Sequence, residues 1–134
     1  MKENIVFDTN VLISGYLWKG KPRQAIHLVR SGKFSLLYCI DSMDELVRVL
    51  SAKFQLDAFE IYRVVLDIKS IGKKITISSK EYPINDDYTD NLFINLALDG
   101  NAKIIVSGDS HLFKLGEFKG IEILTVNGFL RRFS

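Results

Sequence analysis

Short apolar runs alternate along this chain with segments in which apolar residues recur at helical spacing. The runs are rich in β-branched residues, which is typical of buried strands. They lie at 5–7, 34–40, 74–78, 104–106 and 121–126. The helices predicted between them cover 11–18, 22–30, 42–50, 57–68, 90–98 and 127–133. Such an alternation predicts an α/β fold, a three-layer sandwich with a five-stranded, mostly parallel sheet.

Individual residues indicate where the predicted helices begin and end. Pro22 suits the first turn of a helix, and Gly32 suits a helix end. Ser42, followed three positions later by Glu45, matches a helix-capping pair. Asn127 is expected to cap the last helix. The sequence shows no repeat, no low-complexity tract and no internal linker.

Length and composition limit the class of protein. The chain has 134 residues, of which 47% are hydrophobic and 25% charged, so we expect a single domain over residues 1–134. No apolar run approaches the roughly 18–20 residues of a membrane span, and the start of the chain does not resemble a signal peptide. The lone Cys39 excludes an internal disulfide and fits a reducing cytoplasm. A net charge of +2 tolerates a polyanion without requiring one.

Acidic residues lie where the predicted strands end. Asp8 follows the first strand, and Glu45 lies in the first turn of the helix after the second. Asp90 opens the helix after the third strand, and Asp109 follows the fourth. Asp87 is a further acid in the loop before Asp90. Because sheets of this kind bind ligands at the carboxyl ends of their strands, we expect the acids to converge on one edge.

Such a group of carboxylates requires a partner. Like charges at close range raise one another's pKa, and a hard divalent cation removes that cost. Carboxylate and water oxygens are the ligands that Mg²⁺ or Mn²⁺ prefers. The chemistry that follows is hydrolysis of a phosphodiester by a metal-activated water, which needs no serine, cysteine or histidine nucleophile.

Each acid also has a purely structural interpretation. Glu45 completes a capping box with Ser42, Asp90 is a favourable charge at a helix N-terminus, and Asp109 is a turn residue. Asp8 is harder to explain in this way, because an Asp at a strand end before a helix is a common ligand position. The sequence leaves both interpretations open.

Four segments resemble the motifs of PIN domains. Ile5–Leu12 is similar to the family's opening, a strand that ends in Asp followed by Thr or Ser and Asn. Ser42–Leu50 resembles its acidic helix, Asp87–Phe93 its third motif and Ile105–Leu112 its fourth. The third motif departs from the pattern, because a Pro-Asp pair is frequent where Tyr88-Thr89 stands.

The resemblance extends from about Asn4 to Phe133 and implies a sheet order of 3-2-1-4-5 and a Mg²⁺- or Mn²⁺-dependent ribonuclease, often a homodimer. Many such short chains are VapC-like toxins of bacterial toxin–antitoxin pairs, in which the antitoxin protein blocks the acidic site. In the implied site Asp8, Asp90 and Asp109 bind the metal. Glu45 binds it directly or through water and orients the attacking water.

Other residues have supporting roles in this hypothesis. Hydrogen bonds from Thr9, Asn10 and Ser107 would hold the metal ligands in place, although Thr9 is equally suited to cap a helix. The candidates for contact with the RNA substrate are Lys19, Lys21, Arg23 and His111. For these residues a solvated loop, or a polar cap in the case of His111, is the competing interpretation.

Two other functions are compatible with the sequence. Asp8-Thr9-Asn10-Val11 superficially resembles the motif of haloacid-dehalogenase-type phosphatases, in which Asp8 would be the nucleophile. Asn10, however, stands where their second acid is expected. A PIN-like module that binds RNA or a protein without cleavage is the second alternative, against which the presence of all four acids argues.

Overall fold

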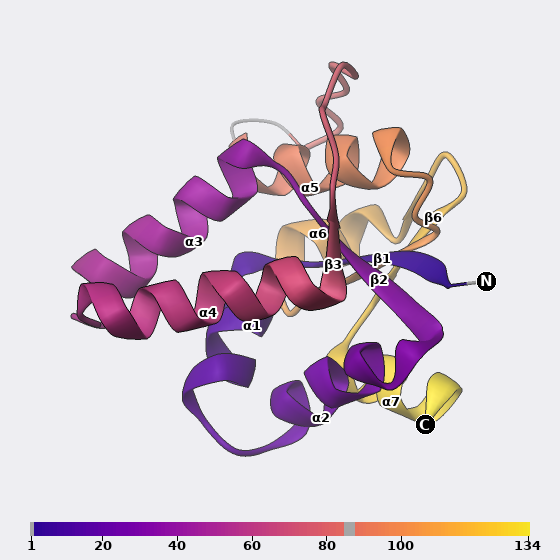
Figure 1. Ribbon diagram of the computed structural model, residues 1–134. Helices are drawn as coiled ribbons and strands as arrows, with labels where there is room; N and C mark the ends of the chain where they lie inside the picture. Colours follow the sequence, from indigo (N-terminus) through magenta and orange to yellow (C-terminus); the bar gives the residue numbers. More distant parts are fainter. Residues whose placement is uncertain (1, 85–87) are drawn as a thin grey trace.

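The computed structural model describes residues 2–84 and 88–134 (Figure 1). Its strands are β1 (Glu3–Phe7), β2 (Phe34–Tyr38), β3 (Gly72–Lys74), β4 (Ile104–Val106), β5 (Glu117–Phe118) and β6 (Ile121–Leu124). Its helices are α1 (Thr9–Leu17), α2 (Lys21–Leu28), the π-helical turn η1 (Val29–Lys33), α3 (Ile40–Ala52), α4 (Ala58–Ile71), α5 (Tyr88–Asp99), α6 (Ser110–Leu115) and α7 (Val126–Phe133). Within the described ranges, no helix has the length and apolar character needed to cross a membrane.

The strands form one sheet in the order β3-β2-β1-β4-β6-β5. Five of them are parallel, in the predicted order 3-2-1-4-5 with β6 in the fifth place. The predicted count of five strands is wrong, because β5 pairs antiparallel with β6 and makes the sheet six-stranded. Lys119 and Gly120 join these two strands with φ values of 48° and 84°, as in a two-residue hairpin turn. A strand of two residues has no periodicity by which it could be predicted.

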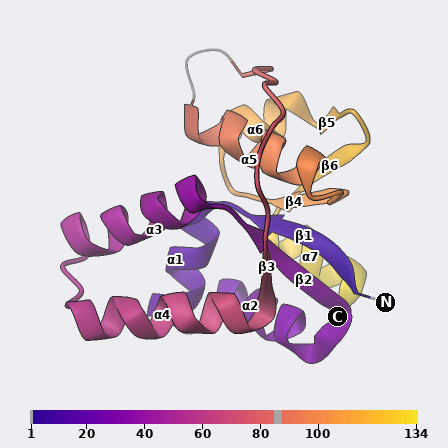
Figure 2. The same cartoon turned by 45° about the horizontal axis from the view of Figure 1, so that its top comes forward.

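Successive strand residues point to opposite faces of the sheet and divide the interior into two cores. Ile5 and Phe7 belong to the core shared with α1, α2, α3, α4 and α7. Val6, which lies between them, belongs to the core shared with α5 and α6. Figure 2 shows α5 and α6 on one side of β1 and α2 and α7 on the other. The predicted three-layer sandwich is confirmed.

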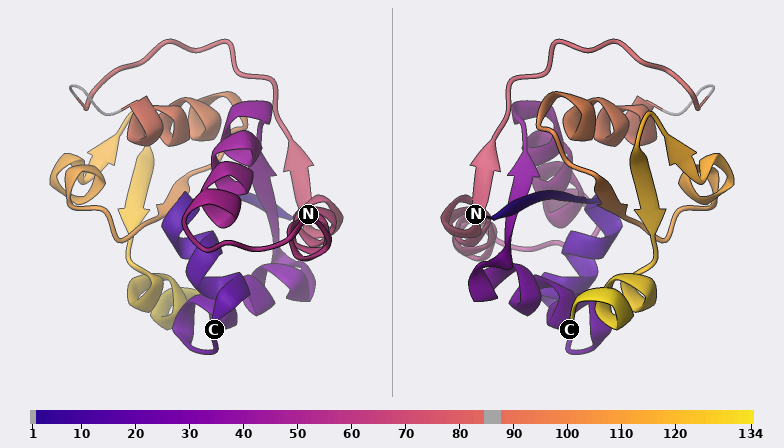
Figure 3. Two further views of the ribbon diagram at one scale, coloured as in Figure 1. Left: turned by 90° about the vertical axis from the view of Figure 1, so that its left-hand side faces the viewer. Right: turned by 90° about the vertical axis from the view of Figure 1, so that its right-hand side faces the viewer.

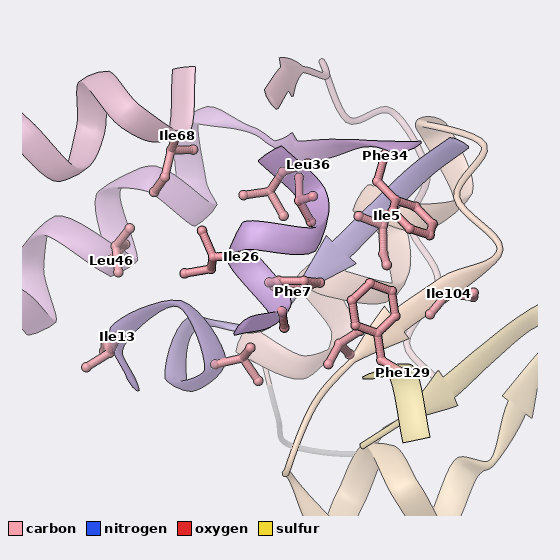
Figure 4. Packing of buried hydrophobic residues seen from close by; sticks show 14 of the residues in the cluster. Ile5, Phe7, Ile13, Ile26, Phe34, Leu36, Leu46, Ile68, Ile104 and Phe129 are labelled. Carbon is pink, nitrogen blue, oxygen red and sulfur yellow. The ribbon is translucent and has the colours of Figure 1, made fainter. Parts of the chain in front are cut away.

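Phe7 fixes the end of β1 within the first core. Its ring meets Phe129 of α7 edge to face, with centroids 5.6 Å apart (Figure 4). Phe34 also contacts Phe129, at a centroid distance of 5.4 Å. Aromatic pairs of this kind contribute about 0.5–1.5 kcal/mol beyond the burial of their surface. Because Asp8 directly follows Phe7, this packing also positions the first of the predicted acids.

The third strand has different bounds from those predicted. β3 covers Gly72–Lys74, and one further ladder bond follows, in which the Ile75 N–H donates to the Tyr38 carbonyl at 2.8 Å. Residues 75–84, which we call the strap, then leave the sheet and pass over the outside of α5 (Figure 3). The alternating pattern at 74–78 therefore indicates an extended segment of which only the beginning is in the sheet.

Side chains of α5 replace a neighbouring strand as hydrogen-bond partners of the strap. Asn95 accepts from the Glu81 N–H and donates to the Glu81 carbonyl, both at 2.9 Å. Asn91 pairs with Ile84 in the same way, at 3.0 and 2.6 Å. Asp99 accepts hydrogen bonds from two backbone N–H groups in the middle of the strap. These three residues are spaced four apart and therefore share one face of the helix.

Helix ends also differ from the predictions. α3 begins at Ile40 because Cys39, and not Ser42, is its cap. The Ser42 N–H donates to Cys39 Sγ at 3.4 Å, and Ser42 Oγ accepts from the Cys39 N–H at 2.9 Å. α7 is capped by Thr125 and not by Asn127. α6 has no counterpart among the predicted helices, because six residues are too few to show helical periodicity.

Substitution of Asn91 tests the attachment of the strap to α5. Asn91→Ala removes both partners of Ile84 and leaves a buried N–H and a buried carbonyl unsatisfied. At about 1–3 kcal/mol for each unsatisfied group, we expect a loss of about 2–6 kcal/mol in the free energy of unfolding, measured by urea denaturation. Asn127→Ala, on the exposed surface of α7, is the control and should change it by less than about 0.5 kcal/mol. Equal effects of the two substitutions would contradict this account.

Candidate metal centre

The pairing of β1 with β4 brings two of the predicted acids to the same edge of the sheet. Val6 is in register with Ile105 and Phe7 with Val106. The ladder continues for one bond beyond the strands, because the Asp8 N–H donates to the Val106 carbonyl at 3.0 Å. Both strands thus end at the same level, and the residues that follow them lie side by side.

The hydroxyl of Ser107 joins Asp8 to Asp109. Ser107 is fully buried, and its hydroxyl donates to Asp8 Oδ2 in a short hydrogen bond. The same oxygen accepts from the backbone N–H of Asp109 at 2.9 Å. A single side chain therefore sets the position of one acid relative to the other.

Asp8 and Asp109 also cap the helices that follow them. Asp8 Oδ1 accepts from the Val11 N–H at 2.8 Å at the start of α1. Asp109 Oδ1 accepts from the His111 N–H at 2.8 Å at the start of α6. Since helix N-termini favour negative charge, both carboxylates lie in a favourable field. The cap of α1 is thus Asp8 and not Thr9.

Glu45 is free of the capping role that was its structural alternative. Because α3 begins at Ile40, Glu45 lies in its second turn and not in the first as predicted. The capping box joins Cys39 and Ser42 without it. Its two carboxylate oxygens accept from one guanidinium nitrogen of Arg48, at 2.8 and 2.9 Å. This contact holds Glu45 at the surface of α3, beside the acids that come from the sheet.

All four predicted acids line one cleft of about 170 Å³ at the carboxyl edge of the sheet. The residues of this acidic cleft are Asp8, Thr9, Asn10, Glu45, Val49, Thr89, Asp90, Phe93 and Asp109. Asp90 lies in the first turn of α5 and is only 5% exposed. Val49, Thr89 and Phe93 are not among the residues expected from the sequence. Val49 and Phe93 lie at helical spacing from Glu45 and Asp90, and Thr89 lies four positions before Phe93. Only the packing of α3 and α5 identifies which face of each helix meets the cleft.

The charge of Asp8 is unfavourable in the protein without a cation. Burial raises the pKa of Asp8 above its usual value of 3.8, and the nearby charge of Asp109 raises it further. Hydrogen bonds from Ser107 and from the Val11 N–H oppose this shift of the pKa. A cluster of hard oxygen donors with a buried carboxylate fits a divalent cation such as Mg²⁺ or Mn²⁺, which would compensate the buried charge.

The predicted substrate-binding residues are divided between two regions. Lys19, Lys21 and Arg23 follow the far end of α1, which separates them from Asp8 by about 13 Å of helix. Arg23 donates to the carbonyls of Gly15 and Tyr16 at 3.1 and 3.2 Å. The guanidinium of Arg23 is therefore hydrogen-bonded to the C-terminal end of α1.

His111 lies next to two acids of the cleft instead, although it is not among the residues that line the cleft. Its Nδ1 is 3.9 Å from Asp90 Oδ2 and 3.8 Å from Asp109 Oδ1. Asp90, Asp109 and His111 form a group of side chains that could hold a metal ion. Asp87, a further acid of the sequence hypothesis, lies outside the residues that the structure describes.

Comparison with known families agrees with this arrangement. The sequence matches the family model of the PIN domain over residues 4–111. The chain belongs to the PIN-domain family. The matched range of the PIN domain contains all four acids and ends at His111. No curated protein matches the sequence.

A solved structure resembles this PIN domain over nearly its whole length. The crystal structure of PAE2754 from Pyrobaculum aerophilum superposes with a TM-score of 0.57 and covers 99% of this chain and 98% of that chain. The sequence identity is 15%, so this likeness shows the fold alone. PIN domains are generally metal-dependent nucleases, and the acidic cleft of this one fits that description.

The buried charge of Asp8 predicts a stabilising substitution. Asp8→Asn keeps an oxygen that can cap α1 and removes the charge, so in the presence of EDTA it should unfold at a higher temperature than the wild type at neutral pH. Because the pKa of Asp8 is higher in the folded than in the unfolded protein, ionisation costs stability as the pH rises through the folded value. The advantage of Asp8→Asn should therefore vanish below about pH 3.8, where both states are protonated.

Asp8→Ala is the matched comparison, since it removes both the charge and the helix cap. Loss of the cap costs about 1 kcal/mol, so Asp8→Ala should be less stable than Asp8→Asn at every pH. Thermal unfolding between pH 3 and pH 8 measures both effects. A wild type that is more stable than Asp8→Asn at neutral pH without metal would contradict the account.

Proposed function

We propose that this PIN domain is an endoribonuclease that hydrolyses RNA phosphodiester bonds with a water activated by Mg²⁺ or Mn²⁺. The observation that carries the proposal is the convergence of four carboxylates, from the ends of β1 and β4 and from α3 and α5, on one cleft. Four acids from separate parts of the chain do not stabilise a fold by meeting, since their charges repel one another. Their value lies in what they bind.

Asp8, Asp90 and Asp109 would hold the cation. When bound, the metal lowers the pKa of a water and stabilises the charge that develops on the phosphate oxygens. Ser107 keeps Asp8 and Asp109 in a fixed relation by its two hydrogen bonds. Thr9 and Asn10 line the same cleft; we propose that they support the ligands.

Glu45 is the proposed acceptor for the proton of the attacking water. It lies across the cleft on α3, and its side chain is 25% exposed, so solvent reaches it. Arg48 holds the carboxylate from outside. Whether Glu45 also contacts the metal directly or through water depends on this ion pair, because an oxygen that binds Arg48 is a weaker ligand for a cation.

The geometry argues against Asp8 as a nucleophile, the role that it would have in a haloacid-dehalogenase-type phosphatase. Its Oδ1 caps α1 and its Oδ2 accepts from Ser107. Both oxygens are thereby committed, and the side chain is 4% exposed. A carboxylate that attacks phosphorus needs an accessible oxygen. The buried and hydrogen-bonded oxygens of Asp8 therefore suit a role as metal ligand better than a role as covalent nucleophile.

The proposed biological setting rests on the resemblance of this short PIN chain to VapC-like toxins. We propose a cytoplasmic toxin of a type II toxin–antitoxin pair, with RNA as substrate, a homodimer as the working form and an antitoxin that covers the acidic cleft. The presence of the PIN motifs in a chain of only 134 residues supports this setting, because many such short chains are toxins. The alternative of a catalytically silent RNA- or protein-binding module requires a cleft that does not bind metal, which the four acids disfavour.

Cleavage of RNA by substituted proteins tests the proposed function. Asp90→Asn and Asp109→Asn should each lower the rate with Mg²⁺ or Mn²⁺ by at least about 100-fold, because each removes a charge that holds the cation. Asp44→Asn, at an exposed acid next to Glu45 on α3, should stay within about twofold of the wild type. The rates are measured on a labelled single-stranded RNA, and EDTA should abolish wild-type cleavage. Undiminished cleavage by both cleft variants would show that the activity does not belong to this site.

A further inference from the structure

His111 is a nitrogen donor at the mouth of a cleft whose other candidate ligands are carboxylates. It is the second residue of α6, two positions after Asp109. The hydrogen bond from its backbone N–H to Asp109 Oδ1 ties the two residues together within one turn. The imidazole of His111 and the carboxylate of Asp109 therefore lie close together, in the turn that follows β4.

The distances around His111 suit a shared cation. One ligand atom each from Asp90, Asp109 and His111 lies within 4.8 Å of the others. The separations between His111 Nδ1 and the two carboxylate oxygens are 3.9 and 3.8 Å. Two metal–ligand bonds of about 2.1 Å span at most roughly 4.2 Å, so both separations are short enough for one ion to contact both atoms.

The ring of His111 is also accessible to an ion that enters from solvent. The His111 side chain is 58% exposed, whereas that of Asp90 is 7% exposed. A cation held by Asp90, which is buried, and by Asp109, which is partly exposed, would thus have the imidazole on its solvent side. Such a position suits a ligand that completes the coordination of the metal at the surface of the cleft.

We propose that His111 is a metal ligand and that its nitrogen makes the centre select Mn²⁺ over Mg²⁺. The inference rests on the proposed metal site and adds to it the identity of one donor and of the preferred ion. Mg²⁺ takes oxygen ligands almost exclusively, whereas first-row transition metals accept imidazole together with carboxylates. A centre of carboxylates alone would lack this basis for discrimination.

The chain offers a matched control, because it contains two histidines, His27 and His111. His27 is exposed on α2, away from the residues of the acidic cleft. The full-length protein is loaded with one equivalent of Mn²⁺ and measured by pulsed electron paramagnetic resonance, which detects nitrogen bound to the ion. The wild type and His27→Asn should show imidazole nitrogen coupling, and His111→Asn should lose it.

Titration calorimetry with Mn²⁺ and Mg²⁺ tests the selectivity. His111→Asn should lower the ratio of Mn²⁺ affinity to Mg²⁺ affinity by at least about tenfold, while His27→Asn leaves it unchanged. Absence of nitrogen coupling in the wild type, or an unchanged ratio in His111→Asn, would overturn the proposal. In that case His111 contacts the RNA or only shapes the start of α6.

The outcomes separate this inference from the proposed function. Mn²⁺ that binds in a manner dependent on Asp109 but without nitrogen coupling would refute the role of His111 and leave the carboxylate centre intact. Nitrogen coupling in a protein that cleaves no RNA would refute the ribonuclease and support the ligand. Mn²⁺ binding that is the same in Asp8→Asn and Asp109→Asn as in the wild type would overturn both.

Discussion

The carboxylate of Asp8 is buried at the end of β1, and three more acids share its cleft. This concentration of like charge around a buried carboxylate is the constraint on which the rest of the structure depends. Ser107 donates to Asp8, the N-terminus of α1 faces it, and a second helix N-terminus faces Asp109. These interactions reduce the electrostatic cost without removing it, since the pKa of Asp8 remains raised. A divalent cation bound by these carboxylates would compensate the remaining charge.

Only a few contacts in the fold are needed to bring the acids together. Parallel pairing of β1 with β4 ends both strands at one level, so Asp8 and Ser107 become neighbours although they are 99 positions apart in sequence. The two cores hold this edge from both faces, with Phe7 packed on Phe129 in one of them. On the other face, Asn91 and Asn95 attach the strap to α5, the helix whose first turn carries Asp90. Packing interactions of residues next to the acids therefore help to determine the geometry of the cleft.

The sequence predicts the parts of this architecture that repeat a strong local pattern. Apolar β-branched runs identify the parallel strands, and acids after four of them suffice to expect the cleft. Features that depend on tertiary contacts are not predicted. The cap of α3 is Cys39, whose thiol has no strong capping propensity, and the apparent Ser42–Glu45 pair obscured it. The strap alternates like a strand, but Asn91, Asn95 and Asp99 supply its partners, and this role of polar residues in a helix leaves no pattern.

A crystal structure of the protein grown or soaked with Mn²⁺ tests the central claim most directly, because anomalous scattering locates the ion without assumptions about its ligands. The account predicts an anomalous peak in the acidic cleft, within coordination distance of carboxylate oxygens of Asp8, Asp90 and Asp109. A cleft that contains only water at saturating Mn²⁺, or a peak confined to another part of the surface, would contradict it.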